Sequence, residues 1–216
     1  MNQQNSTKSG SRPYHHGDLH QEILCAACEL LEENNIASLS LRAVAKKVGV
    51  SHTAPYRHFK DKECLLAGIA KLGFDQLTVQ IEDAVRSHPN DPAAQLQEAG
   101  HRYAQLSLNN PQCTQLMFGG TLPIDDTYPD LKESADMAFD GLSAIIEAGQ
   151  NSNVFRQGKV EELALAAWSG IHGLTLLLIS GNLPEILSIP SDIRPLTNIV
   201  TTSMLEGLKA GKIEGS

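Results

Sequence analysis

The chain has 216 residues, a length that suits one or two small domains and excludes a large multidomain enzyme. Hydrophobic residues make up 41% of it and charged residues 19%, which is typical of a folded chain rather than a disordered one. The net charge of −8 at first argues against a nucleic-acid partner, because phosphate binding needs surface lysine and arginine.

The charge is unevenly distributed along the chain. Residues 1–65 hold eight basic and seven acidic side chains, a net of +1, which leaves −9 for the remainder. Between Arg42 and Lys62, six basic residues accompany a single acid, a local charge of +5. Such a segment in an acidic protein is typical of nucleic-acid binding, although a solvated basic helix face gives the same pattern.

Membrane insertion and export are not expected from this sequence. The longest mostly apolar run covers residues 174–179, far short of the roughly 20 residues that a bilayer span needs. The four cysteines are too few and too scattered for a disulfide scaffold. We therefore expect a soluble cytoplasmic protein with no membrane partner.

The first elements in chain order are a polar arm and a helix. Residues 1–17 are polar and end in PYHHG, which predicts a disordered arm. Apolar residues then recur at helical spacing from Asp18, the expected N-cap, to about Asn34.

Two short helices and a longer one are expected next. Ser40 is placed to cap a helix over residues 41–48, and Gly49 is placed to end it, because glycine tolerates the left-handed conformation of a sharp turn. Ser51 is the expected cap of a helix from residue 52 to about 59, and Asp61 the cap of a fourth helix.

The sequence HPNDP after about Ser87 breaks the helical pattern. Further helices are expected at about 93–108, 112–118, 128–150, 160–179 and 191–210. No stretch alternates with period two, so strand signals are almost absent. The sequence predicts an all-α fold with an N-terminal three-helix domain over residues 18–78 and a helical domain over 79–216.

Two short helices joined by a turn that contains glycine, with a helix on each side, form a helix-turn-helix pattern over about residues 41–60. Packing requires the apolar face of the first helix, which leaves Arg42 outside, where it could donate two hydrogen bonds to a guanine edge. The start of the second short helix could contact base edges in a major groove, and Tyr56, His58 and Lys62 are typical phosphate contacts.

The run LSLRAVAKKVGVSHTAPYRHFKDKECLLAGIA resembles the DNA-binding domain of the TetR family of bacterial transcriptional regulators. The signature Y-x-x-F-x-x-K-x-x-L is present as Tyr56, Phe59, Lys62 and Leu65. Pro55 departs from the leucine that the family often has, and we expect it to stiffen or re-aim the recognition helix. The resemblance, which covers about residues 18–78, implies these DNA-facing residues: Arg42, His52, Thr53, Ala54, Tyr56, Arg57, His58 and Lys62.

The C-terminal half is similar to a subgroup of that family whose ligand-binding domain carries a Trp-His-Gly motif, here Trp168, His172 and Gly173 in AAWSGIHGLTLLL. Trp168 and His172 lie one helical turn apart on one face, and Gly170 and Gly173 would let another helix approach closely. Residues that could line an effector pocket, or equally form ordinary core packing, are Tyr103, Met117, Phe118, Phe139, Trp168 and His172.

The family resemblance also implies a homodimer through the last two long helices, here those that begin at Val160 and Ser191. The second of these carries an apolar stripe: Ile193, Leu196, Val200, Met204 and Leu208. A dimer would present two recognition helices to successive major grooves about 34 Å apart, so we expect an operator DNA that is nearly palindromic.

Catalytic and metal-binding motifs find little support, and we expect neither an enzyme nor a cofactor or metal. No G-x-S-x-G elbow, P-loop or H-E-x-x-H motif is present. Cys25 and Cys28 have the spacing of a redox motif or half a zinc site, but a second pair is missing and packing is favoured. His15, His16 and His20 could bind a metal, although solvated histidines near DNA are the simpler interpretation.

The sequence therefore predicts a DNA-binding transcriptional regulator, a repressor that a small effector releases from its operator. The alternative is a helical small-molecule-binding or protein-interaction module that carries a basic helix pair without specific DNA binding.

Overall fold

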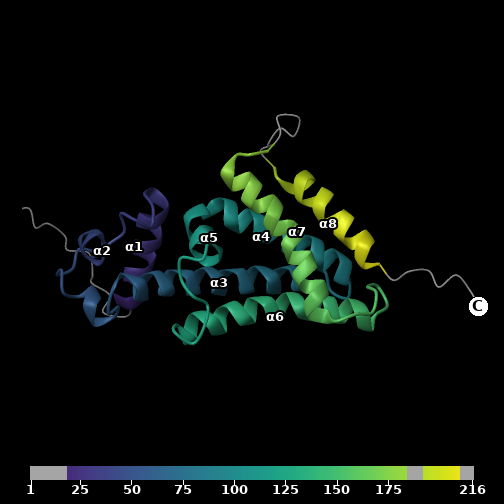
Figure 1. Ribbon diagram of the computed structural model, residues 1–216, viewed down its shortest axis with the longest axis horizontal. Helices are drawn as coiled ribbons and strands as arrows, with labels where there is room; N and C mark the ends of the chain where they lie inside the picture. Colours follow the sequence, from purple (N-terminus) through teal and green to yellow (C-terminus); the bar gives the residue numbers. More distant parts are fainter. Residues whose placement is uncertain (1–18, 184–191, 210–216) are drawn as a thin grey trace, which may run out of the picture.

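The computed structural model describes residues 19–183 and 192–209, which form eight α-helices and one short 3₁₀ helix (Figure 1). The elements are α1 (Leu19–Glu33), α2 (Leu41–Val48), η1 (Pro55–Arg57), α3 (Lys62–Ser87), α4 (Pro92–Asn109), α5 (Pro111–Phe118), α6 (Pro129–Asn151), α7 (Val160–Ser180) and α8 (Arg194–Leu208). Within the described ranges there is no strand, which confirms the all-α prediction. The expected arm, its histidines, the Asp18 cap and both ends predicted for the last helix lie outside these ranges.

The N-terminal helices gather at one end of α3, and their starts and stops follow the sequence signals (Figure 1). Ser40 accepts a hydrogen bond at 3.2 Å from the backbone N–H of Ala43, and so caps α2. Gly49 ends α2 with φ +81°, a conformation that glycine adopts without steric cost. The buried face of α2 carries Leu41 and Val44 and packs on α1.

The recognition segment differs from the sequence prediction of a helix over residues 52–59. The structure has turns followed by a 3₁₀ helix over Pro55–Arg57. Ser51 does not cap a helix, because its hydroxyl lies 3.2 Å from that of Thr53. Pro55 provides the physical reason, because it lacks the backbone N–H that would continue a helix from residue 52. Its own carbonyl accepts from His58 at 3.0 Å and from Phe59 at 2.9 Å, which completes a single turn.

Helix α3 is the longest element and joins both parts of the chain. It begins where the Asp61 carboxylate accepts the backbone N–H of Cys64 at 2.8 Å, a bond that lowers the pKa of Asp61. From there α3 runs without interruption to Ser87, with α4 and α5 against one side and α6 against the other (Figure 1). The same helix thus contributes to the packing of both the helix-turn-helix region and the C-terminal helices.

Gly170 and Gly173 of α7, both expected to let another helix approach closely, have different surroundings. A Cβ added to Gly170 would lie 2.7 Å from the Met204 sulfur, so glycine lets α8 approach α7. A Cβ added to Gly173 would meet no atom of the described chain within 4 Å, so this glycine faces open space. The expectation of a close approach is therefore confirmed at Gly170, whereas no other described helix of the same subunit approaches Gly173.

Helix α7 is long and apolar enough, by length and composition alone, to cross a bilayer. In the fold it packs against α4, α6 and α8 and buries Leu163, Ile171 and Leu178. The core helix of a soluble protein meets the same criteria, so this feature does not indicate a membrane protein.

Phe155 follows α6 and folds back onto it over a glycine. Its side chain is 1% exposed, and a Cβ added to Gly149 would clash with the Phe155 ring. We expect Gly149→Ala to lower the free energy of unfolding by about 1–3 kcal/mol, because the ring must shift in a packed core. Urea unfolding measures the change. The exposed neighbour Ala148, changed to serine, is the control and should stay within about 0.5 kcal/mol of the parent; equal stability of the two variants would contradict this packing.

Candidate DNA-binding surface and effector cavity

The helix-turn-helix region presents a basic surface to solvent. Arg42, Lys46, Arg57 and Lys60 are exposed and make no ion pair within the described residues. Lys47 is different, because its ammonium is held at 2.9 Å from Glu29 and 2.8 Å from Glu33 on α1. The first four side chains are therefore available to a polyanion, whereas Lys47 joins α2 to α1.

Most of the predicted DNA-facing residues lie on this surface. His52, Thr53, Arg57 and His58 are exposed, together with Arg42, and Ala54 is half-buried. Tyr56 has an exposed fraction of 51%, so its ring and hydroxyl project from the turn instead of packing into the core. An exposed tyrosine beside unpaired cations has the chemistry of a phosphate contact.

Lys62 is placed differently from the other predicted contacts. It is half-buried, and its ammonium donates to the carbonyls of Ile36 at 2.5 Å and Ala37 at 3.2 Å. These bonds fasten the loop between α1 and α2 to the start of α3. An ammonium has three donors, so one remains for a phosphate.

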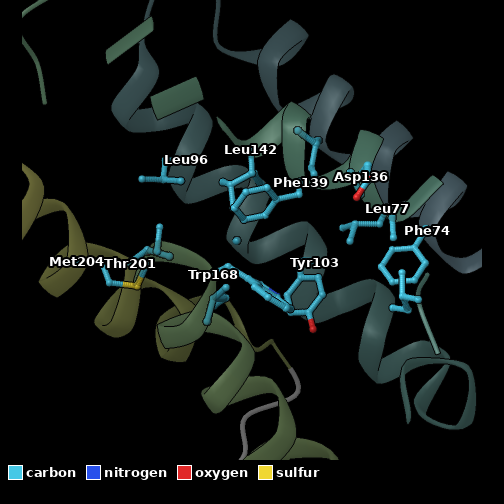
Figure 2. Close-up of a pocket in the computed structure, with 18 residues that line it drawn as sticks. Phe74, Leu77, Leu96, Tyr103, Asp136, Phe139, Leu142, Trp168, Thr201 and Met204 are labelled. Carbon is cyan, nitrogen blue, oxygen red and sulfur yellow. The ribbon is translucent and has the colours of Figure 1, made fainter. Parts of the chain in front are cut away.

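A cavity of about 270 Å³ lies among α3, α4, α6, α7 and α8 (Figure 2). Its lining is almost entirely apolar, with four aromatic rings. These rings belong to Phe74, Tyr103, Phe139 and Trp168. Asp136 is the single charged residue among the described lining residues; its side chain is 57% exposed, which places the carboxylate at the rim.

Tyr103 and His172 form a buried polar pair beside the cavity. The Tyr103 hydroxyl lies 2.5 Å from Nδ1 of His172. Burial raises the pKa of Tyr103 to about 12 and lowers the pKa of His172. The phenol is thus protonated and the imidazole neutral near pH 7, so the two groups share one hydrogen bond, whose direction follows from which ring nitrogen carries the proton.

The six residues expected at an effector pocket are close together but have different roles. Tyr103, Phe139 and Trp168 line the cavity. Phe118 and His172 stand behind this wall, with ring centroids 5.5 Å and 5.4 Å from Trp168. Met117 is buried against α3, near Gly73.

Several lining residues escaped the sequence prediction, because they occupy ordinary core positions. They come from α3, α4, α6 and α8: Phe74, Leu77, Ile81, Leu96, Ala99, Ala138, Thr201 and Met204. Three of them could have been predicted from the apolar stripe of α3 by continuing it beyond residue 72. Phe74, Leu77 and Ile81 recur there at helical spacing.

His20, Cys25 and Cys28 are the candidate metal or redox residues that lie within the described part of the chain. Within the ranges 19–183 and 192–209, no group of three histidine, cysteine or acidic residues could hold a metal ion. His20 stacks on Phe59 with centroids 4.8 Å apart. Cys28 packs against the core, and burial raises its pKa to about 11, whereas Cys25 is exposed, so the packing interpretation applies to Cys28 alone.

A basic helix-turn-helix surface joined by one long helix to a separate helical domain with a cavity is the arrangement of a DNA-binding regulator. Two family models match the chain: bacterial regulatory proteins of the TetR family over residues 23–69, and the tetracyclin repressor-like C-terminal domain over residues 96–202. The chain belongs to the TetR family of DNA-binding transcriptional regulators, and this family consists of regulators rather than enzymes.

Individual relatives agree with this assignment. The nucleoid occlusion factor SlmA of Vibrio vulnificus is 30% identical over 158 residues, which cover 68% of this chain and 76% of the relative. The SlmA protein of Vibrio campbellii is 28% identical over 151 residues, with the same coverage. A solved protein of unknown function from Rhodococcus sp. RHA1 is 28% identical and superposes with a TM-score of 0.79 over 92% of this chain and 99% of that one.

The buried histidines generate a pH dependence of stability. Burial lowers the pKa of His172, and burial and the charge of Arg194 lower that of His101. The unfolded chain therefore binds protons more readily, so this stability is complete above about pH 6.5 and is lost as the pH falls through the lower folded pKa. We expect His172→Asn to make unfolding free energy depend less steeply on pH between 7 and 5, by up to about 1.4 kcal/mol per pH unit.

Urea unfolding at a series of pH values measures this slope. His172→Asn also removes a hydrogen bond and lowers stability at every pH, so the slope, not the absolute value, is the readout. His101→Asn should reduce the slope independently. A His172→Asn protein with the parent's slope would show that His172 is not buried in its neutral form.

Proposed function

We propose that the protein is a cytoplasmic repressor that binds operator DNA as a homodimer and is released when a small effector enters the cavity. The observation that carries the proposal is that α3 begins at Lys62, directly after the exposed cations of the helix-turn-helix region, and lines the cavity with Phe74, Leu77 and Ile81. A ligand that fits only one arrangement of α3 would shift the population of the DNA-binding state. FadR of Bacillus subtilis, of similar fold with 18% identity and a TM-score of 0.65, was solved with stearoyl-CoA, which supports a ligand role for such a domain.

The proposed DNA contacts fall into two kinds. His52, Thr53 and Ala54 are assigned to base edges because they lie at the start of the recognition segment, and Arg42 because it is exposed near the start of α2. Residues assigned to phosphates are Tyr56, Arg57, His58 and Lys62. Lys62 acts in addition as a positioning residue, since two of its three donors hold the loop after α1.

The proposed dimer uses the outer faces of α7 and α8. Four large apolar side chains on these two helices, which pack against each other, are 43–59% exposed: Leu165, Leu176, Leu177 and Ile199. Covering such a face removes apolar surface from water, the main driving force of association. The glycine at position 173, open on this side, would let a partner helix approach.

Loss of one unpaired cation should weaken DNA binding and its salt dependence. We expect Arg57→Ala to lower affinity for all DNA sequences and to reduce the slope of log K against log salt by about 2, because one phosphate contact per subunit, and so two per dimer, is lost. Fluorescence anisotropy at several salt concentrations measures both. Arg42→Ala should instead relax preference at one or two base pairs at a cost of about 1–3 kcal/mol.

Arg86→Ala is the matched control for charge. Arg86 lies near the far end of α3, about 36 Å from Lys62 at 1.5 Å per residue, and pairs with Asp83. The control should leave the salt slope unchanged. Lys62→Met should lower unfolding stability as well as DNA affinity, which separates its positioning role from that of Arg57. An unchanged slope for Arg57→Ala on any duplex would favour a helical module that binds no operator.

A charge placed on the outer face of α7 should break the dimer. We expect Leu177→Glu to be monomeric by analytical ultracentrifugation and to lose at least tenfold in affinity for a near-palindromic operator while its helical circular dichroism persists, because an unpaired carboxylate would be buried in the interface. Met137→Glu, at a 53% exposed position of α6, is the control and should remain dimeric. If Leu177→Glu stays dimeric, the interface lies elsewhere.

A further inference from the structure

The charge and hydrogen-bonding character of the cavity restrict its ligand more narrowly than its apolar lining does. We propose that the cavity binds a lipophilic amine or neutral alcohol of about ten carbon atoms and discriminates against the matching carboxylate. This proposal rests on the proposed effector role of the cavity. Three features carry the proposal: the volume, the single rim carboxylate and the aromatic rings of the lining.

The volume sets the size of the ligand. An engineered apolar cavity of about 150 Å³ holds a benzene ring, so a cavity of 270 Å³ corresponds to about eleven non-hydrogen atoms. A decyl chain with one head atom has this size. The lining offers such a chain apolar side chains from five helices, with Leu96, Leu77 and Phe139 around the space in Figure 2.

Asp136 sets the preferred charge. No lysine, arginine or histidine is among the described lining residues, so a bound carboxylate would find no cation in the wall. Asp136 lies on the same helix as Phe139 and is at the edge of the cluster in Figure 2. A ligand with its tail inside and its head at this rim would place an ammonium near a carboxylate, and an anion near a like charge.

Lys132 is the partner of Asp136 and does not reverse this preference. The two side chains form an ion pair at 2.7 Å, one helical turn apart, and both are largely exposed. Exposed pairs at this spacing are weak, so a ligand ammonium can replace Lys132 at little cost. An anion would have to draw Lys132 away and leave Asp136 unpaired at the rim, because Lys132 itself does not line the cavity.

The aromatic part of the wall also favours a cation over an anion. The four aromatic rings of the lining add a favourable environment for a cation, since ring faces attract positive charge.

The test compares three ligands that differ only in the head group: decylamine, decanol and decanoate, titrated at pH 7 by isothermal calorimetry below their aggregation limits. We expect decylamine to bind at least tenfold more tightly than decanoate, a difference of about 1.4 kcal/mol, with decanol between them. Asp136→Asn should narrow this ratio to less than threefold. Asp140→Asn, one turn further along α6 and outside the cavity lining, should preserve it.

Filling variants establish that the ligands enter the cavity. Ala135→Phe, at a half-buried lining position, should reduce binding of all three compounds at least tenfold, and Ala167→Phe repeats the measurement should the first variant fail to fold. Unaltered binding in a folded filling variant would place the ligand elsewhere and overturn the proposal.

Three further results of the ligand titrations bear on the ligand class alone and not on DNA binding. Equal affinity for decanoate and decylamine, or an Asp140→Asn effect as large as that of Asp136→Asn, would overturn the charge rule and leave the cavity as a ligand site. Failure of all three compounds to bind would overturn the size and charge class together. Operator binding is measured on the same preparations without ligand, so a failure of the DNA-binding proposal is seen independently.

Discussion

The continuous burial of one face of α3 is the constraint on which the rest of the structure depends. Near its start, Leu65 and Ile69 are fully buried in the packing that includes α1; further along, Phe74 and Ile81 pack against α4 and α6. A helix cannot easily bend within an unbroken hydrogen-bond ladder that has no proline in its interior. A displacement of α3 at the cavity therefore moves the start of the helix, together with the loop that Lys62 holds.

A second connection, through α5, runs parallel to this one. The Glu32 carboxylate at the end of α1 accepts the backbone N–H groups of Gln112 at 3.1 Å and Cys113 at 2.8 Å, and so caps the start of α5. At its other end α5 carries Phe118 into edge-to-face contact with His172, at 5.0 Å between centroids. The position of α1 is thus tied to the aromatic wall of the cavity by a carboxylate at one end of a two-turn helix and a ring at the other.

The sequence predicted those parts of the fold that depend on local chemistry. Caps at Ser40 and Asp61 and the left-handed Gly49 were recognisable, because each acts within a few residues of its own position. The recognition segment was predicted too regular, since the sequence pattern did not reveal that Pro55 would bury its ring and end the structure as a 3₁₀ turn. The redirection of Lys62 to the carbonyl of Ile36 was also hidden, because the partners lie 26 residues apart.

The site was only partly predictable, for a related reason. Trp168 and His172 drew attention because their residue types are uncommon in an apolar helix, whereas Leu77 and Ala99 look the same whether they fill a core or line a cavity. The cavity forms because side chains from five helices do not fill the space between them. The sequence of any one helix does not reveal this. The sequence also does not reveal that Asp136 lies at the rim of the cavity. Its i,i+4 pair with Lys132 is a common feature of any solvated helix.

Helix α7 illustrates how several demands on one element shape its composition. One face buries Leu163 and Ile171 in the core, a second turns Trp168 to the cavity, and a third leaves Leu176 and Leu177 outside. A helix that is apolar on every side is normally buried on every side. The proposed dimer provides the missing cover, and it explains without a membrane why this helix meets the length and hydropathy of a bilayer span. In that dimer α7 would contact the core, the ligand and the partner subunit at once. A movement of the cavity wall would therefore change the spacing of the two DNA-binding surfaces.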